Sequence, residues 1–142
     1  MIEAGEISSL VPHAGDMSLI ERVISFDDKQ IVCETSTHLD PANPLRAWQR
    51  LSAINAIEYG AQAMALHGAL TGGDNDNSCL VAARNVEIQI DYLDQLESYI
   101  RVCAELQMKD VNAAVYRFSV AHGEDVIAAG RLTIAYGQGA NS

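Results

Sequence analysis

Glu58 is the residue of this sequence whose type and surroundings most strongly suggest chemistry. It lies within AINAIEYGAQAMA, one of the most apolar stretches of the chain, and Gln62 follows four residues later on the same face of a helix. Burying a carboxylate is costly unless it is paired or lies at a cleft. In apolar surroundings a carboxyl group holds its proton more strongly, so Glu58 can act as a general acid. The alternatives are a Glu that reaches the surface at a sheet edge or pairs with an arginine.

Two of the four histidines lie where functional groups are often mounted, at the ends of predicted elements. His13 lies in a loop ahead of the first predicted strand, and His38 follows a strand and precedes a Pro-rich loop. An imidazole titrates near neutral pH and therefore suits a general base. His67 is nine residues past Glu58, which predicts that it points to the opposite side of the helix. His122 is expected to be exposed in a hairpin turn.

The elements that must position these groups are one helix and several strands. The helix is predicted from about Trp48 to Leu70, because this segment has no proline and its apolar residues run almost continuously around it. Such a helix is usually buried within its domain. Before it, Met17–Asp27 and Gln30–Thr37 predict a β-hairpin. After it, apolar and polar residues alternate in about four strands between Val86 and Tyr136. The pattern predicts a single α+β domain over 1–142, with an antiparallel sheet curled around the helix.

Composition excludes several classes of function. The chain of 142 residues has a net charge of −10 and only nine basic residues, which are scattered, so we expect neither nucleic acid nor an acidic membrane surface as a partner. No apolar run is long enough to span a bilayer and no signal peptide is recognisable, so we expect a cytoplasmic protein. Cys33, Cys79 and Cys103 form no metal-binding spacing and are expected to be small buried residues.

Four segments carry a resemblance to a known family. LVPHAGDMSLIERVISFDD and IEYGAQAMALHG resemble the first strand and the central helix of FabA/FabZ-like beta-hydroxyacyl-ACP dehydratases, in which a Glu is followed four residues later by Gln. HLDPANPLR and AARNV are most similar to the predicted 3-hydroxyacyl-ACP dehydratases of aryl polyene and flexirubin-type pigment clusters. The resemblance covers residues 9 to 137 or so, with the motifs in the same order.

The resemblance implies a hot-dog fold and dehydration of 3-hydroxyacyl thioesters on acyl carrier protein to trans-2-enoyl thioesters, without a cofactor or metal. It implies His13 as the catalytic base, with His38 as second choice. Glu58 would be the acid or would orient the hydroxyl, and Gln62 would hold Glu58. Backbone N–H groups at the start of the helix would hold the developing enolate oxygen.

The chain departs from the fatty-acid enzymes at two positions. It lacks their HFPG loop, which carries a catalytic histidine just before the helix, and Asn55 replaces a glycine ahead of the Ile-Glu pair. Asn55 and Gln62 are expected to bind substrate together with Arg46 and Arg84. Arg46 and Arg50, one helical turn apart, would lie near the tunnel mouth and receive the acidic carrier protein.

Two other functions fit the same residues. A hot-dog thioesterase would use Glu58 to activate water and would release a free thiol. A non-catalytic subunit would bind the acyl chain while a second hot-dog chain carries out the chemistry, and the missing HFPG loop favours this alternative. Hot-dog proteins bury one sheet edge against a partner, so we expect a homodimer or a heterodimer with another hot-dog subunit, and an acyl carrier protein with a phosphopantetheine-linked chain as the further partner.

Overall fold

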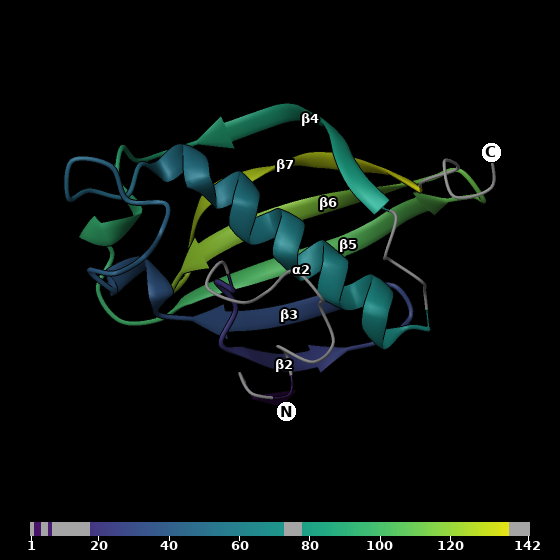
Figure 1. The fold of residues 1–142 in the computed structure, drawn as a ribbon, viewed down its shortest axis with the longest axis horizontal. Coiled ribbons are helices and arrows are strands. Elements are labelled where there is room, and N and C mark those ends of the chain that lie inside the picture. The colour runs from purple at the N-terminus through teal and green to yellow at the C-terminus, as the bar shows by residue number, and fades with distance from the viewer. Residues whose placement is uncertain (1, 4–5, 7–17, 73–77, 137–142) are drawn as a thin grey trace.

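Seven antiparallel strands form one curved sheet, and a long helix lies across one face of it (Figure 1). This computed structural model describes residues 2–3, 6, 18–72 and 78–136. Within these residues the order of strands is β1-β2-β3-β5-β6-β7-β4. The strands are β1 (Ile2–Glu3), β2 (Arg22–Phe26), β3 (Gln30–Thr35), β4 (Ser78–Ile88), β5 (Ile100–Lys109), β6 (Ala113–His122) and β7 (Asp125–Tyr136). The helix is α2 (Ala56–Leu70), and three short 3₁₀ helices are η2 (Thr37–Leu39), η3 (Ala53–Asn55) and η4 (Leu93–Gln95).

The predicted α+β layout is confirmed. The first hairpin forms between β2 and β3, and four strands follow α2. β5 and β6 alternate buried and more exposed positions along much of their length, as the period of two predicted, because one face of the sheet packs against α2. No helix among the described residues is long and apolar enough to cross a membrane.

The predicted start of the helix at Trp48 is wrong, because α2 begins only at Ala56. Trp48 and Gln49 have φ angles of 54° and 66°, which a right-handed helix does not allow. They form a tight turn in which Ala47 and Arg50 exchange backbone hydrogen bonds of 2.8 and 3.0 Å. The prediction treated this segment as helical because it contains no proline and continues the apolar pattern of the helix.

Helix α2 comes very close to β6 at Gly60. A Cβ atom at Gly60 would lie 2.7 Å from two ring atoms of Phe118, which is fully buried. The buried face of the helix contains both small and large residues, which fit against the sheet: Ala56, Tyr59, Gly60, Ala63, Met64, Leu66 and His67. The lack of a side chain at Gly60 therefore sets the distance between helix and sheet.

His67 fixes the last turn of α2. Its Nε2–H donates to the carbonyl oxygen of Asp27 in the β2–β3 hairpin at 2.8 Å, and its Nδ1 accepts from the Tyr116 hydroxyl at 2.7 Å. The carbonyl oxygen can only accept, which fixes the tautomer. Burial raises the pKa of Tyr116 to about 12, so the hydroxyl keeps its proton. His67 is therefore a buried structural residue.

The three cysteines lie in strands as predicted, but their burial differs. Cys33 is buried in β3 and Cys103 is half-buried in β5, whereas Cys79 is exposed in β4. The prediction of a buried residue is wrong for Cys79, because β4 is the last strand of the sheet and has a neighbour on one side only among the described residues.

We predict that Gly60→Ala lowers the free energy of unfolding by about 1–3 kcal/mol through overpacking against Phe118. Helix propensity alone predicts the opposite sign, a gain of about 1 kcal/mol. Urea denaturation of Gly60→Ala, Phe118→Leu and the double variant measures the coupling, and the cost of the alanine should shrink once the ring is removed. A Gly60→Ala variant more stable than the wild type would contradict the close packing.

Candidate active site

Glu58 lies in the first turn of α2, at the end of the helix that faces the loops. Its side chain is half-buried, and no described residue forms a hydrogen bond or an ion pair with its carboxylate. The neighbouring residues Ala56 and Tyr59 are fully buried. Glu58 therefore lies at the boundary of the core with its carboxylate available to another group, as a general acid requires.

Tyr59 fixes the start of α2 through a buried set of hydrogen bonds. Its hydroxyl lies 2.9 Å from Thr37 Oγ1 and accepts from Asn43 Nδ2 at 3.2 Å. Asn43 Nδ2 also donates to the Thr37 carbonyl oxygen at 2.9 Å. Burial raises the pKa of Tyr59 against the opposing effect of these hydrogen bonds. The position of Glu58 thus depends on the loop that follows β3, which sequence reasoning did not identify.

Gln62 connects α2 to the segment that precedes β2. Its Oε1 accepts from the backbone N–H of Leu19 at 2.8 Å, and the Leu19 carbonyl oxygen accepts from Thr35 and Thr37 hydroxyl groups at 2.6 and 2.7 Å. The predicted base, His13, lies outside the described residues. Leu19, six residues after His13 in the sequence, is bound to Gln62 on α2.

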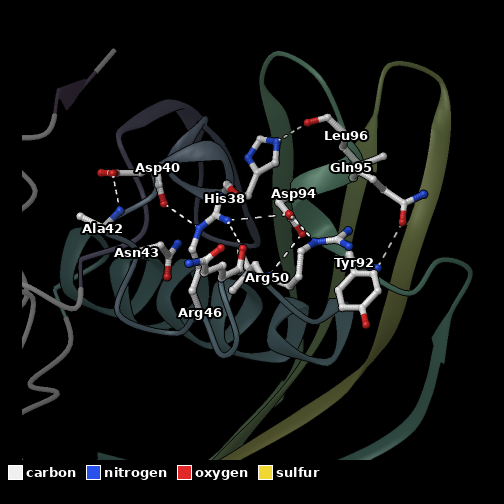
Figure 2. Close-up of polar contacts among 12 residues, drawn as sticks. His38, Asp40, Ala42, Asn43, Arg46, Arg50, Tyr92, Asp94, Gln95 and Leu96 are labelled. Atoms are coloured by element: carbon white, nitrogen blue, oxygen red, sulfur yellow. Dashed lines mark hydrogen bonds and ion pairs between the residues drawn. The ribbon is translucent and has the colours of Figure 1, made fainter.

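His38, the second predicted base, is completely buried in η2. Its Nε2–H donates to the Leu96 carbonyl oxygen at 2.8 Å, so Nδ1 carries the lone pair, and this buried atom has no hydrogen-bond partner among the described residues (Figure 2). Burial lowers the pKa of His38, although the hydrogen bond to Leu96 opposes this effect. The ring is therefore neutral near pH 7, but it is sealed from solvent in this protomer.

Arg46 and Arg50 do not lie one helical turn apart as predicted, because a tight turn separates them. Arg46 donates to the carbonyl oxygens of Asp40, Gln49 and His38 at 2.8, 3.0 and 3.1 Å. Its guanidinium group therefore holds the loop together (Figure 2). With 14% of its side chain exposed, Arg46 has little surface to offer to a carrier protein.

Asp94 binds the loop that precedes α2, and sequence reasoning did not identify it. Its carboxylate accepts from Arg50 Nε at 2.8 Å and from the Leu51 N–H at 3.2 Å (Figure 2). Burial alone would raise the pKa of Asp94, but these hydrogen bonds together hold it below its usual value. The Arg50 guanidinium also lies 3.8 Å from the centre of the Tyr92 ring. Asp94 lies more than forty residues from both donors, so no local pattern indicates it.

The two other predicted substrate-binding residues lie in different places. Asn55 directly precedes α2, near Glu58 in the chain, and its Nδ2 donates to the Ser52 carbonyl oxygen at 3.1 Å. Arg84 is exposed on β4, directly opposite Arg131 of β7. The structure thus groups Asn55, Glu58 and Gln62 along the first half of α2 and leaves Arg84 on the sheet. Their roles in substrate binding stay predictions.

Burial of His38 predicts a pH-dependent stability. Its folded-state pKa is below the ordinary value of 6.5, so on acidification the unfolded chain takes up a proton that the folded chain resists. The free energy of unfolding should therefore fall as the pH decreases through this range, by at most about 1.4 kcal/mol per pH unit. Urea titrations from pH 5 to pH 8 measure the slope. His38→Gln should flatten the slope; a slope equal to that of the wild type would exclude His38 as the cause.

Comparison with solved structures confirms the hot-dog fold. The chain is similar to the dehydratase heterocomplex ApeI:P from Xenorhabdus doucetiae, with 22% identity, a TM-score of 0.82 and coverage of 93% of this chain and 91% of that one. AziG from S. sahachiroi matches with 12% identity, a TM-score of 0.66 and coverage of 89% and 97%. A thioesterase from Staphylococcus aureus matches with 17% identity, a TM-score of 0.62 and coverage of 80% and 90%.

These structural likenesses are too distant in sequence to show more than the fold. No curated protein matches the chain. The model of one family, described as ApeP-like, ApeP dehydratase, matches residues 5–141, which is nearly the whole sequence and includes all the predicted site residues. This match confirms the resemblance to the dehydratases of aryl polyene clusters. The chain belongs to the ApeP-like family of hot-dog dehydratases.

Proposed function

We propose that this chain dehydrates 3-hydroxyacyl thioesters carried by acyl carrier protein to trans-2-enoyl thioesters, with Glu58 as the acid. The observation that carries the proposal is a half-buried carboxylate in the first turn of the central helix with no partner among the described residues. Membership of the dehydratase family supports the reaction class. The acyl-carrier substrate follows from the resemblance to the pigment-cluster enzymes.

The reaction is the loss of one water molecule from two adjacent carbons. A base removes the proton from the carbon next to the thioester, and the electrons of that C–H bond form the new C=C bond as the C–O bond breaks. Glu58 gives its proton to the departing hydroxyl group, which leaves as water. The backbone N–H groups at the start of α2 stabilise the negative charge that develops on the thioester oxygen.

His13 remains the first choice for the base. It is six residues before Leu19, whose N–H is bound to Gln62 on α2. Six residues span at most roughly 20 Å, so this length of chain is sufficient for His13 to reach Glu58. His38 is less suited because it is completely buried and its Nε2–H is bound to Leu96.

We predict that Glu58→Gln lowers the rate of hydration of an enoyl thioester by about 10²–10⁴-fold, since glutamine cannot exchange a proton. Hydration is the reverse reaction and is followed by the loss of enoyl absorbance. Glu124→Gln is the matched control, because Glu124 is exposed in the β6–β7 turn. Unchanged rates in Glu58→Gln, with native stability, would remove Glu58 from the mechanism.

The same assay tests the thioesterase alternative. Release of free thiol that depends on Glu58, without any change in enoyl absorbance, would identify hydrolysis. The folds of thioesterase and dehydratase are alike, so the product is the deciding measurement.

We further propose that strand β4 pairs with a second hot-dog subunit. β4 is eleven residues long and is the terminal strand of the sheet, with β7 as its neighbour. It exposes the apolar side chains of Leu80 and Val81, at 39% and 56%. An edge strand with exposed apolar side chains can pair with another chain. The solved relative from Xenorhabdus doucetiae is a heterocomplex, which favours an unlike partner over a second copy.

We predict that Val81→Lys prevents assembly with that partner, because the charge would be buried between the two sheets' edge strands. Val111→Lys is the control, since Val111 is equally apolar and 84% exposed but lies in the β5–β6 turn. Light scattering of the chain alone and mixed with an ApeI-type subunit measures the mass. Normal assembly of Val81→Lys would place the interface elsewhere.

The mixture also tests whether this chain supplies chemistry or only support. If the assembly is active and Glu58→Gln in this chain leaves its rate unchanged, the partner carries the whole active site. If Glu58→Gln in this chain abolishes the activity of the assembly, Glu58 is part of a functional site, even if the isolated chain is inactive.

A further inference from the structure

Three arginines form a row across neighbouring strands. Arg84 of β4 lies directly opposite Arg131 of β7, and Arg131 lies directly opposite Arg117 of β6. Residues directly opposite each other in an antiparallel sheet have Cβ atoms about 4.5–5.5 Å apart. The chain has only nine basic residues and a net charge of −10, so one third of its positive charge is concentrated in this row.

The arginine row, defined as Arg84, Arg117 and Arg131, lies on the face of the sheet turned away from α2. Phe118 packs against Gly60 of α2, and side chains alternate between the two faces, so Arg117 points to the other side. Arg131 precedes the buried Leu132 and belongs to the same outer face as Arg117. All three arginines are exposed. The sheet therefore separates the row from Glu58.

No residue of the described chain forms an ion pair with the arginine row. The ion pairs of the described chain involve Arg22, Arg46 and Arg50. Glu105 of β5 lies opposite Arg117 and Glu87 lies on β4 near the row, but neither forms an ion pair with it. Like charges directly opposite each other destabilise a sheet, so the row carries a cost that an anionic ligand would remove.

An open depression of about 480 Å³ lies over the same strands. Arg117, Arg131 and the carboxylate of Glu87 line it, together with Asn85 and Gln107. Asn85 has a φ of 54° at an irregularity in the pairing of β4 with β7, where extra residues are accommodated. Such bulges are frequent beside functional sites because they redirect side chains. The depression thus combines cationic groups, hydrogen-bonding groups and a size that is usual for ligand sites.

We infer that the arginine row is a binding site for a phosphate group, separate from the dehydratase site. Guanidinium groups bind phosphate oxygens through paired, charge-assisted hydrogen bonds. A multiply charged anion over Arg131 interacts with cations on both sides of it. Glu87 and Glu105 border the row and repel an anion, so the most favourable position for the phosphate is at the centre of the row. The phosphate belongs either to a phosphopantetheine arm or to a free phosphate compound.

A partner strand paired with β4 does not account for the row. Such a strand would lie one strand spacing beyond Arg84 and two spacings from Arg131, and strands are about 4.8 Å apart. Arg117 lies on β6, one strand farther from such a partner than Arg131, and it also lines the depression. A ligand seated in the depression reaches Arg117 and Arg131 directly.

The test compares the full wild-type chain with Arg131→Gln, Arg117→Gln and the control Arg101→Gln. Arg101 is also exposed on the sheet, but it lies opposite Glu34 and Ala121. Thermal unfolding and calorimetric titration are measured with inorganic phosphate, pyrophosphate and phosphopantetheine, each against sodium chloride of equal ionic strength. We expect phosphate compounds to raise the Tm of wild type and Arg101→Gln, and the affinity to fall at least about tenfold in Arg131→Gln and Arg117→Gln.

In chloride alone, Arg131→Gln should match or exceed the wild-type Tm, because it removes repulsion on both sides of the central arginine. Tighter binding of phosphopantetheine than of pyrophosphate would identify the carrier arm as the source of the phosphate, and the reverse would identify a free compound. Equal responses of Arg131→Gln and the wild type would overturn the proposal. So would a wild type that responds no more to phosphate than to chloride, or an Arg131→Gln variant whose single defect is assembly with a partner.

Discussion

The contact between Gly60 and Phe118 is the constraint on which the rest of this structure depends. A hot-dog domain has a single long helix to cover its sheet, so the distance between the two decides how much of each is buried. At Gly60 the helix backbone rests against the Phe118 ring with no room for a Cβ atom. One turn in either direction, Ala56 and Met64 fill the remaining space with side chains of different sizes. This close approach brings the residues beside Gly60 to a fixed height above the sheet, and Glu58 is among them.

Polar contacts hold the helix at both ends of this contact. Tyr59 binds the loop after β3, and His67 binds the β2–β3 hairpin and β6. Both side chains are buried and hydrogen-bonded. Their directional contacts fix the position of α2 along the sheet, which apolar contacts alone would not specify. Glu58 and the Nδ1 atom of His38 differ from them, since neither has a partner among the described residues. Of the two, only His38 Nδ1 is fully buried, and a buried polar atom without a partner calls for an explanation.

The sheet separates two environments of opposite character. Toward α2 it presents an apolar surface, with the half-buried carboxylate of Glu58 at its margin. Away from α2 it presents the arginine row, in a chain that is otherwise strongly acidic. The edge strand β4 belongs to both, because it carries Arg84 and ends close to the loop that precedes the helix. A partner on β4 would therefore extend both environments at once.

The sequence by itself determined the kind of elements, and it singled out Glu58, whose catalytic role stays a prediction. The alternation of apolar residues and the long apolar helix are local patterns, and they predicted the α+β layout correctly. Glu58 was recognisable because a carboxylate is out of place in such a helix. The family motifs, read in order, predicted a hot-dog dehydratase that the family match confirms.

Only the tertiary structure decided where the helix begins, which cysteine is exposed and which arginines are neighbours. Asp94, from another part of the chain, accepts hydrogen bonds from Arg50 and the Leu51 N–H. These contacts stabilise the turn before α2, where the local sequence favoured a helix. Cys79 is exposed because β4 ends the sheet, and Arg84, Arg117 and Arg131 meet because the strand register aligns them. Contacts between distant segments depend on strand order and register, and the pattern within one segment decides which face is buried but not which strand lies beside it.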